Sequence, residues 1–226
     1  MSDNLATYFD AITLSYMAHK GQSRRDLDIP YWTHVALVSS IVAEWGGDAI
    51  QIFAALGHDI IEDTGVNRES IDSILGSEVG SVIQSLTASK DKTKTWERRK
   101  LEYIIQFVVG QVDPRAYLTK LADSYANMTS FTNTTVRTGV PAAKAKTINS
   151  YVALAHICLF HLRGLVSVED YRVVRYNVKR MFNRVIETGT CPDAELLHQI
   201  DFDDTMADAY TWYTRLEAVW KDKSST

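Results

Sequence analysis

The chain has 226 residues, a formal net charge of -4, 46% hydrophobic residues and 23% charged residues. This composition is ordinary for a globular protein and excludes extended disorder. The negative net charge argues against a duplex nucleic acid partner, although a local basic patch can still seat a small phosphorylated ligand.

Apolar residues recur mostly at three- and four-residue steps, and only four prolines and eleven glycines interrupt them. That period is typical of helices packed on one face, so we predict an all-α protein. The first clear apolar stripe runs from Tyr31 to Trp45, with Pro30 in its first turn and Gly46-Gly47 as its stop. His34 is placed near the start of this helix.

A second helix is predicted from about Asp48 to Asp63, ending at Thr64-Gly65. Near its end the sequence is His58-Asp59-Ile60-Ile61-Glu62-Asp63. Residues four apart are neighbours on a helix surface, so these polar side chains are expected to crowd onto one side of its last turns.

Further helices are predicted over the rest of the chain: two short ones between Asn67 and Leu86, then Tyr117–Met128, Ala142–Leu165, Val168–Glu187 and Ala194–Trp220. The segment Ser89–Lys100 is polar and rich in Lys and Arg. It has two interpretations, a solvated loop entering a charged helix or a mobile flap over an active site. Nothing resembles an interdomain linker, so we predict one domain over residues 1–226.

The sequence also predicts a cytoplasmic protein without membrane association. Residues 1–10 lack a basic region of the kind that begins a signal peptide, and no stretch approaches the 18 apolar residues of a membrane span. Cys158 and Cys191 lie apart without CxxC spacing, so we interpret them as reduced structural thiols.

Two imidazoles and two carboxylates stand out as a candidate metal site: His34, His58, Asp59 and Asp123. A mixed nitrogen and oxygen set suits a divalent transition metal better than calcium, which prefers oxygen alone. Each residue taken singly is as well explained as a buried, hydrogen-bonded structural group. An HD dipeptide by itself does not identify a metal site, so the surrounding sequence is needed to identify one.

That surrounding sequence resembles the RelA/SpoT-type alarmone hydrolases, in their small stand-alone class. The similarity covers roughly residues 4–160 and rests on four segments in order: AHKGQSRR (18–25), PYWTH (30–34), AALGHDIIEDT (54–64) and KLAD (120–123). The resemblance implies an HD-domain helical bundle with additional C-terminal helices over about residues 166–226.

The resemblance also assigns roles. It implies one divalent ion, usually Mn²⁺, at His34, His58, Asp59 and Asp123. Glu62 and Asp63 match an acidic pair that orients the attacking water and helps proton transfer, whereas their plainer interpretation is surface acids at a helix end. Substrate contacts are implied for Arg24, Arg25, Lys90, Lys94, Asn127 and Tyr151. For the two arginines, surface solubility is the plain alternative.

The chain departs from the family after the last predicted metal ligand. The usual Asp-Arg-Leu-His-Asn-Met is Asp123-Ser124-Tyr125-Ala126-Asn127-Met128 here, and Thr129-Ser130-Phe131 also lacks the customary Arg. Loss of the basic residue at Ser124 leaves the metal ligands intact but alters the surroundings of the pocket. The base of the substrate, guanine or adenine, therefore stays open.

The expected function is a metal-dependent 3'-pyrophosphohydrolase of (p)ppGpp or (p)ppApp, which releases pyrophosphate and leaves the 5'-phosphorylated nucleoside. Two alternatives remain, an HD phosphohydrolase of another nucleotide and a non-catalytic alarmone-binding regulator. The intact pair Glu62-Asp63 argues against a pure binder, because two acids repel phosphate. The expected partner is a small nucleotide, and the oligomeric state is left open.

Overall fold

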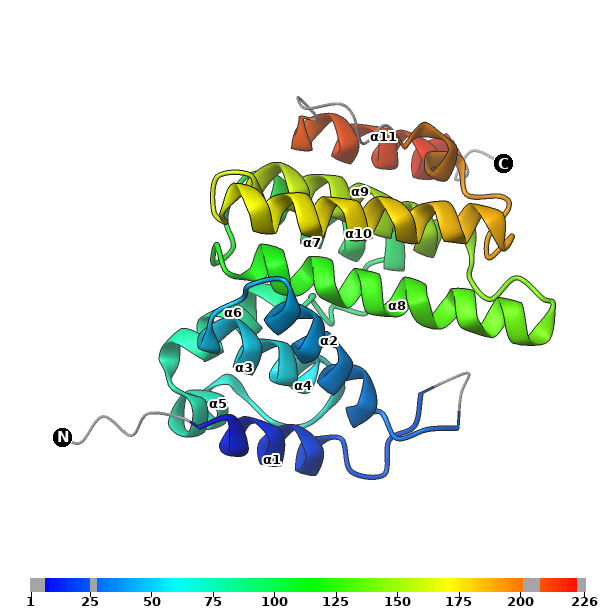
Figure 1. The fold of residues 1–226 in the computed structure, drawn as a ribbon. Helices are drawn as coiled ribbons and strands as arrows, with labels where there is room; N and C mark the ends of the chain where they lie inside the picture. The colour runs from blue at the N-terminus through cyan, green and yellow to red at the C-terminus, as the bar shows by residue number, and fades with distance from the viewer. Residues whose placement is uncertain (1–6, 25–27, 201–207, 223–226) are drawn as a thin grey trace. The chain divides into compact units, whose positions relative to one another are not determined.

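The computed structural model describes residues 7–24, 28–200 and 208–222. Across these ranges the regular structure is helical, apart from an isolated bridge between Ser23 and Pro30 (Figure 1). The predicted all-α class is confirmed. No helix within the same ranges is long and apolar enough to cross a membrane.

The chain groups into two compact units, each built from two separate stretches of sequence. The first unit contains the described residues up to Lys90 together with Val112–Asp123, and the second contains Asp91–Gln111 and the described residues from Ser124 onward. This grouping does not follow the expected division between a core and a C-terminal extension. The single-domain organisation stays a prediction.

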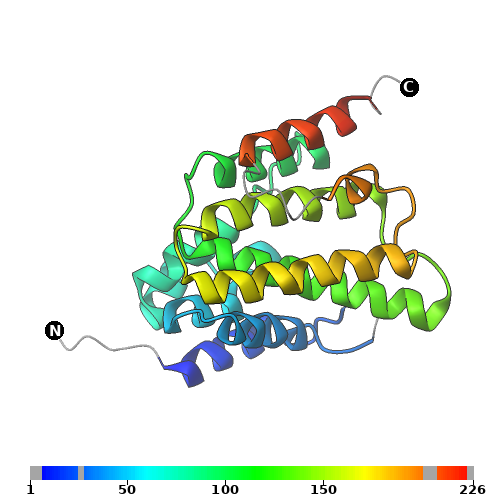
Figure 2. The ribbon, with the colours of Figure 1, turned by 45° about the horizontal axis from the view of Figure 1, so that its top comes forward.

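Helix α3 is the centre of the first unit, where it packs against α1, α2 and α6 (Figures 1 and 2). Val38, Ala55 and Ile83 have no exposed surface, so the core of this unit lies between α2, α3 and α6. The elements of the unit are α1 (Tyr8–Ala18), α2 (Trp32–Glu44), α3 (Ala49–Gly57), α4 (Ile60–Asp63), α5 (Arg68–Leu75), α6 (Ser77–Leu86) and the first turns of α8 (Ala116–Thr138).

The prediction of one continuous helix from Asp48 to Asp63 is wrong. Helix α3 begins after an Asp48 capping box and ends at Gly57, and α4 covers only Ile60–Asp63. Asp59 at the junction has φ -99° and ψ -3°, in the sparsely populated bridge region between helix and strand. Apolar periodicity continues across the break, and for that reason the sequence pattern concealed it.

Helix α9 is the centre of the second unit, where it packs against α7, α10, α11 and the short 3-10 helix η1. The His156 ring on α9 stacks on Trp212 of α11 with centroids 3.7 Å apart. Cys158 and Cys191 are buried here and are not joined by a disulfide. The elements are α7 (Trp96–Val108), the later turns of α8, α9 (Ala145–Leu162), α10 (Val168–Glu187), η1 (Glu195–Gln199) and α11 (Ala209–Asp222).

Two further helix predictions need correction in this unit. The helix expected over Tyr117–Met128 continues to Thr138, where the buried hydroxyls of Thr132 and Thr135 are satisfied by donating to carbonyls one turn earlier. The helix expected over Ala194–Trp220 is instead η1, which ends at an extended Ile200, followed by α11 from Ala209.

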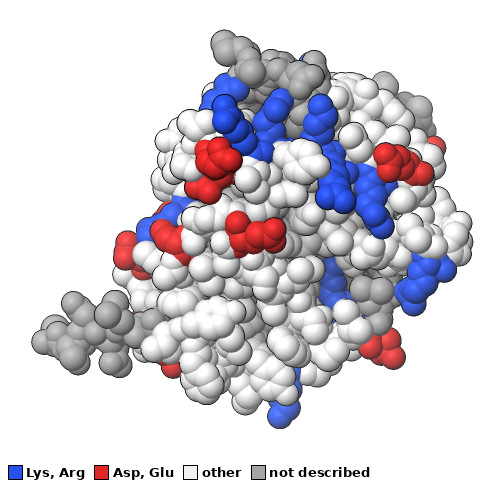
Figure 3. Space-filling view, in the orientation of Figure 1, with Lys and Arg blue, Asp and Glu red and all other residues white. Residues whose placement is uncertain are grey.

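Basic side chains gather on the second unit. Figure 3 shows Lys and Arg concentrated over the region where α10 lies in Figure 1. This helix carries Arg172, Arg175, Lys179, Arg180 and Arg184 along its sequence. A local basic surface therefore exists on a chain whose net charge is negative.

Candidate metal centre

The four predicted metal ligands lie together in the first unit. His34 Nε2 is 3.3 Å from Asp123 Oδ1 and 3.9 Å from Asp59 Oδ2. His58 Nε2 is 3.0 Å from Asp59 Oδ2 and 3.6 Å from Asp123 Oδ1. His34, His58 and Asp123 are each no more than 6% exposed. Three separate segments, α2, the junction of α3 and α4, and α8, thus bring two nitrogens and two carboxylates to one point.

The break between α3 and α4 allows adjacent residues to share this site. Neighbouring side chains on a helix point about 100° apart, so His58 and Asp59 could not converge within a continuous helix. Gly57 lets α6 pack closely against the end of α3, because a Cβ at this position would lie 2.6 Å from Ile83 Cδ1. The adjacent residues His58 and Asp59 can therefore reach one site because the helix is interrupted at this position.

The orientation of His58 leaves one nitrogen available to an ion. Nδ1 is 2.8 Å from the Ala55 carbonyl, which can only accept, so Nδ1 carries the hydrogen. Nε2 is buried and faces the carboxylates of Asp59 and Asp123. A backbone carbonyl on the outer nitrogen is the usual arrangement for a metal-ligating histidine.

The charges of the cluster are those of a cation site. Burial would raise the pKa of Asp123, but Lys120 and the two histidines hold it well below its usual value. Burial would likewise raise the pKa of Asp59, yet His58 lowers it. Burial lowers the pKa of His34. The same burial acts on His58, but Asp59 and Asp123 raise its pKa well above the usual value. Two ionised carboxylates therefore face a place where positive charge is stabilised.

Lys120 and Tyr31 surround the cluster and orient its carboxylates. Lys120 Nζ is 2.7 Å from Asp123 Oδ2 in a buried ion pair, so the other oxygen, Oδ1, is the one near the histidines. The Tyr31 hydroxyl donates to Asp59 Oδ2 at 2.5 Å. Burial first, then the charge of Asp59, raises the pKa of Tyr31 far above its usual value, so its hydroxyl keeps its hydrogen.

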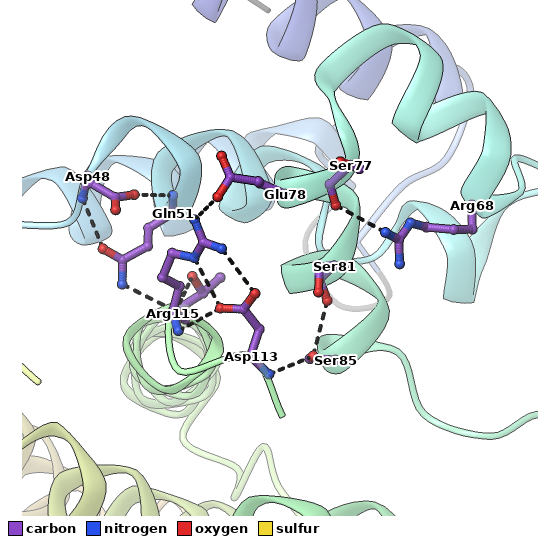
Figure 4. Close-up of polar contacts among 10 residues, drawn as sticks. Asp48, Gln51, Arg68, Ser77, Glu78, Ser81, Ser85, Asp113 and Arg115 are labelled. Carbon is purple, nitrogen blue, oxygen red and sulfur yellow. Dashed lines mark hydrogen bonds and ion pairs between the residues drawn. The ribbon is translucent and has the colours of Figure 1, made fainter. Parts of the chain in front are cut away.

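A polar network anchors the start of α8, the helix that bears Asp123 (Figure 4). Arg115 donates through Nε and Nη2 to the two oxygens of Asp113 at 3.0 and 3.2 Å, and through Nη1 to Glu78 at 3.2 Å. Gln51 of α3 donates to the Arg115 carbonyl at 3.3 Å. The helix with His58 at its end is thereby tied to the helix with Asp123.

Glu62 and Asp63 lie in α4, directly after the junction. The Ala88 amide donates to Glu62 Oε2 at 3.3 Å. Partial loss of water, then the charge of Asp59, raises the pKa of the exposed Asp63 above its usual value, while the Tyr31 hydroxyl opposes this effect. Acids at the C-terminal end of a long helix are destabilised by the helix dipole. Both acids lie in a four-residue helix, so this destabilisation does not apply to them.

One predicted substrate contact, Arg24, lies beside this cluster. Two backbone bonds, Arg24 N to Ile29 O and Tyr31 N to Gln22 O, both 2.9 Å, join residues 22–24 to residues 29–31 just before α2. The guanidinium carbon of Arg24 is 5.8 Å from the centre of the Tyr31 ring, within range of a cation-π contact. Arg25 lies outside the described residues.

The other predicted substrate contacts are described within their own units. Lys90 is exposed at the end of the first unit. Lys94 belongs to the second unit and is paired with Glu102 at 2.8 Å. Asn127 follows Asp123 by four positions on α8, and the Tyr151 ring lies 6.3 Å from that of Phe131. Their roles stay predictions.

Tyr31 and Lys120 are members of the site that the sequence pattern does not predict. Tyr31 was interpreted as part of an apolar stripe, and nothing in that pattern shows where a hydroxyl points. Lys120 precedes Asp123 by three positions within the KLAD segment. Residues three apart share a helix face, and that spacing was a usable signal.

Comparison with known proteins gives this geometry a family context. The HD domain family matches residues 11–157. The GTP pyrophosphokinase of Streptomyces coelicolor is 36% identical over 140 residues, which are 61% of this chain and 16% of that protein. The bifunctional (p)ppGpp synthase/hydrolase SpoT of Escherichia coli is 26% identical over 202 residues, 88% of this chain and 28% of SpoT. The chain therefore spans a small part of the length of both relatives.

A solved structure is also similar. It belongs to a metazoan ortholog of SpoT that hydrolyzes ppGpp, with a TM-score of 0.61 and 26% identity, and the match covers 82% of this chain and 100% of that one. These relatives confirm the resemblance to RelA/SpoT-type proteins that the sequence segments indicated.

Proposed function

This chain is a member of the HD domain family, and we propose that it is a metal-dependent 3'-pyrophosphohydrolase of nucleotide alarmones, (p)ppGpp or (p)ppApp. The observation that carries the proposal is the buried cluster of two imidazoles and two carboxylates with an acidic pair directly after it. The names of two relatives support the substrate class, because SpoT of Escherichia coli is a (p)ppGpp synthase/hydrolase and its metazoan ortholog hydrolyzes ppGpp.

The residues of the cluster fit a divalent ion, and Mn²⁺ is the one we propose. His34, His58, Asp59 and Asp123 would hold it, because the buried Nε2 of His58 faces Oδ2 of Asp59 at 3.0 Å and Oδ1 of Asp123 at 3.6 Å. Nitrogen and carboxylate donors together suit manganese better than calcium. When bound, the ion would supply a Lewis acid that neutralises phosphate charge and makes water more acidic.

The acidic pair supplies the proton transfer. In the proposed reaction, the oxygen of a water attacks the phosphorus attached to the ribose O3', and the bond between that phosphorus and O3' breaks. Asp63 takes the proton of the water and then returns a proton to the departing O3', so that a hydroxyl is restored on the ribose as pyrophosphate leaves. Glu62, held by the Ala88 amide, orients the water.

Basic and polar residues bind the substrate in this proposal. Arg24, beside Tyr31, contacts the base or its phosphates by stacking or by forked hydrogen bonds. Arg25, Lys90 and Lys94 complete the phosphate contacts, and Asn127 and Tyr151 line the ribose and base. Ser124 is buried at the position where the resemblance implies an Arg, so guanine and adenine substrates both have to be tested.

The decisive experiment incubates the Mn²⁺-loaded protein with ppGpp and ppApp separately and identifies the phosphate product. Pyrophosphate release, lost in Asp123→Asn and kept in the control Asp72→Asn on the distant helix α5, is the expected result. Orthophosphate instead of pyrophosphate would reassign the protein as a phosphohydrolase acting at the 5' end. Tight binding of either nucleotide without turnover would make it a regulator.

A further inference from the structure

His19 is a buried histidine that has no place in the proposed reaction. It follows the last residue of α1 and is 1% exposed. Its Nδ1 lies 2.9 Å from Gln22 Oε1, an oxygen that only accepts, so Nδ1 is the donor. Its Nε2 is buried without a hydrogen-bond partner among the described residues.

Two routes connect His19 to the acids of the site. Gln22, which accepts from His19, donates through Nε2 to the backbone carbonyl of Asp63 at 3.2 Å. The His19 ring also packs against Tyr31, with ring centroids 4.9 Å apart, and Tyr31 donates to Asp59. The hydrogen-bonded route leads from His19 through Gln22 to Asp63, whereas the contact with Tyr31 is ring packing.

Helix α4 requires such outside support. It has only four residues, too few to be stable alone, and the carbonyls at a helix C-terminus have no partner within the helix. The Asp63 carbonyl is one of these groups, and Gln22 satisfies it. The direction of the Asp63 side chain depends on this last turn.

Stability alone does not account for a histidine at this position. A buried polar atom without a partner costs free energy, so an apolar side chain of similar size would fill the same space at a lower cost. A requirement for the Nδ1 donor explains why an imidazole is nevertheless present.

We propose that His19 is a positioning residue, which acts through Gln22 to hold the end of α4 and so aim Asp63 at the reacting water. This inference rests on the proposed function for its catalytic consequence. The structural part, restraint of α4 by His19 and Gln22, stands without it.

The test compares His19→Leu, His19→Asn and Gln22→Leu, with Thr13→Ala on the exposed face of α1 as the matched control. An Asn amide nitrogen occupies the place of imidazole Nδ1, so His19→Asn keeps the donor to Gln22 and removes Nε2. Hydrogen exchange of the backbone amides over residues 59–66 is the readout that needs no substrate. We expect faster exchange there in His19→Leu and Gln22→Leu, and near wild-type exchange in His19→Asn and Thr13→Ala.

Kinetics and metal binding supply the second readout. His19→Leu should lower kcat about tenfold, the size of effect seen for residues that orient a site from outside, with KM and Mn²⁺ affinity within about twofold of wild type. His19→Asn should recover most of that loss. The double variant His19→Leu/Gln22→Leu should be no slower than either single variant, because both residues act through the same series of hydrogen bonds.

Three results would overturn the inference: unchanged exchange over residues 59–66 in His19→Leu, a His19→Asn variant as impaired as His19→Leu, or losses that multiply in the double variant. If the wild-type protein releases no pyrophosphate from either alarmone, the proposed function fails. The exchange measurement still decides the positioning role in that case.

Discussion

Replacing Arg115 with Met should destabilise the protein, although Arg115 touches none of the predicted metal ligands. The substitution keeps most of the side-chain length and removes three charged hydrogen bonds, two to Asp113 and one to Glu78. It leaves the Asp113 carboxylate, only 10% exposed, without its main cation. The position matters because Arg115 directly precedes α8, which carries Asp123 two turns later.

The size of the effect follows from the exposure of the partners. Removing one member of a fully buried ion pair costs about 3–5 kcal/mol, and a surface pair contributes about 0–1 kcal/mol. The Arg115 side chain is 28% exposed, so an intermediate cost of about 2 kcal/mol is expected. For a chain of this length, that corresponds to a drop in Tm of about 4–8 °C. The bond to Glu78, whose side chain is 69% exposed, contributes little of it.

The assay is thermal and urea unfolding of wild type, Arg115→Met and the control Glu78→Gln, with Mn²⁺ affinity measured on the same samples. Glu78→Gln should cost less than about 0.5 kcal/mol. Equal costs for the two variants, or a cost below about 0.5 kcal/mol for Arg115→Met, would show that the network does not anchor α8.

Three other measurements test the same structure. Burial would raise the pKa of Asp113, but Arg115 lowers it below 3.8. The pair therefore stabilises the fold above that pH, and this contribution is lost as pH falls through the folded pKa. The difference in free energy of unfolding between wild type and Arg115→Met should narrow between about pH 5 and pH 3, and a constant difference would contradict this. Tyr31→Phe removes the hydroxyl that orients Asp59 and should weaken Mn²⁺ binding about tenfold by titration calorimetry, whereas an unchanged affinity would mean that the hydroxyl does not support the site. Gly57→Ala places a Cβ against Ile83 and should weaken Mn²⁺ binding with a stability loss of about 1–2 kcal/mol, while unaltered binding would show that the junction tolerates a side chain.

The sequence predicted the helices where one apolar period coincides with one helix, as over Tyr31–Trp45 and Val168–Glu187. The prediction failed where the apolar period continues across a change of backbone direction. The residues His58 and Asp59 illustrate this, because their hydrophobic neighbours Leu56 and Ile60 keep the helical spacing across the break. The break is set by the need to bring two adjacent side chains to one point, a tertiary constraint that local propensity does not contain.

The candidate site was partly predictable for a similar reason. Its proposed ligands were found from residue type and order, and the structure places all four in one cluster. The groups that orient them were not found, because a hydrogen bond such as that of Tyr31 to Asp59 joins residues far apart in the chain. Buried partners of this kind depend on side-chain direction, which periodicity leaves undetermined.

The three-segment origin of the cluster has a consequence for how the chain behaves as a polymer. An ion bound by α2, the junction of α3 and α4, and α8 would join three segments at one site and so close two large loops of the chain. The unfolded chain does not form this binding site. The free energy of ion binding therefore adds to the free energy of unfolding, by about 2.7 kcal/mol when the free ion concentration exceeds its dissociation constant a hundredfold. Melting curves recorded against metal concentration would then report occupancy of the site directly, before any substrate is known.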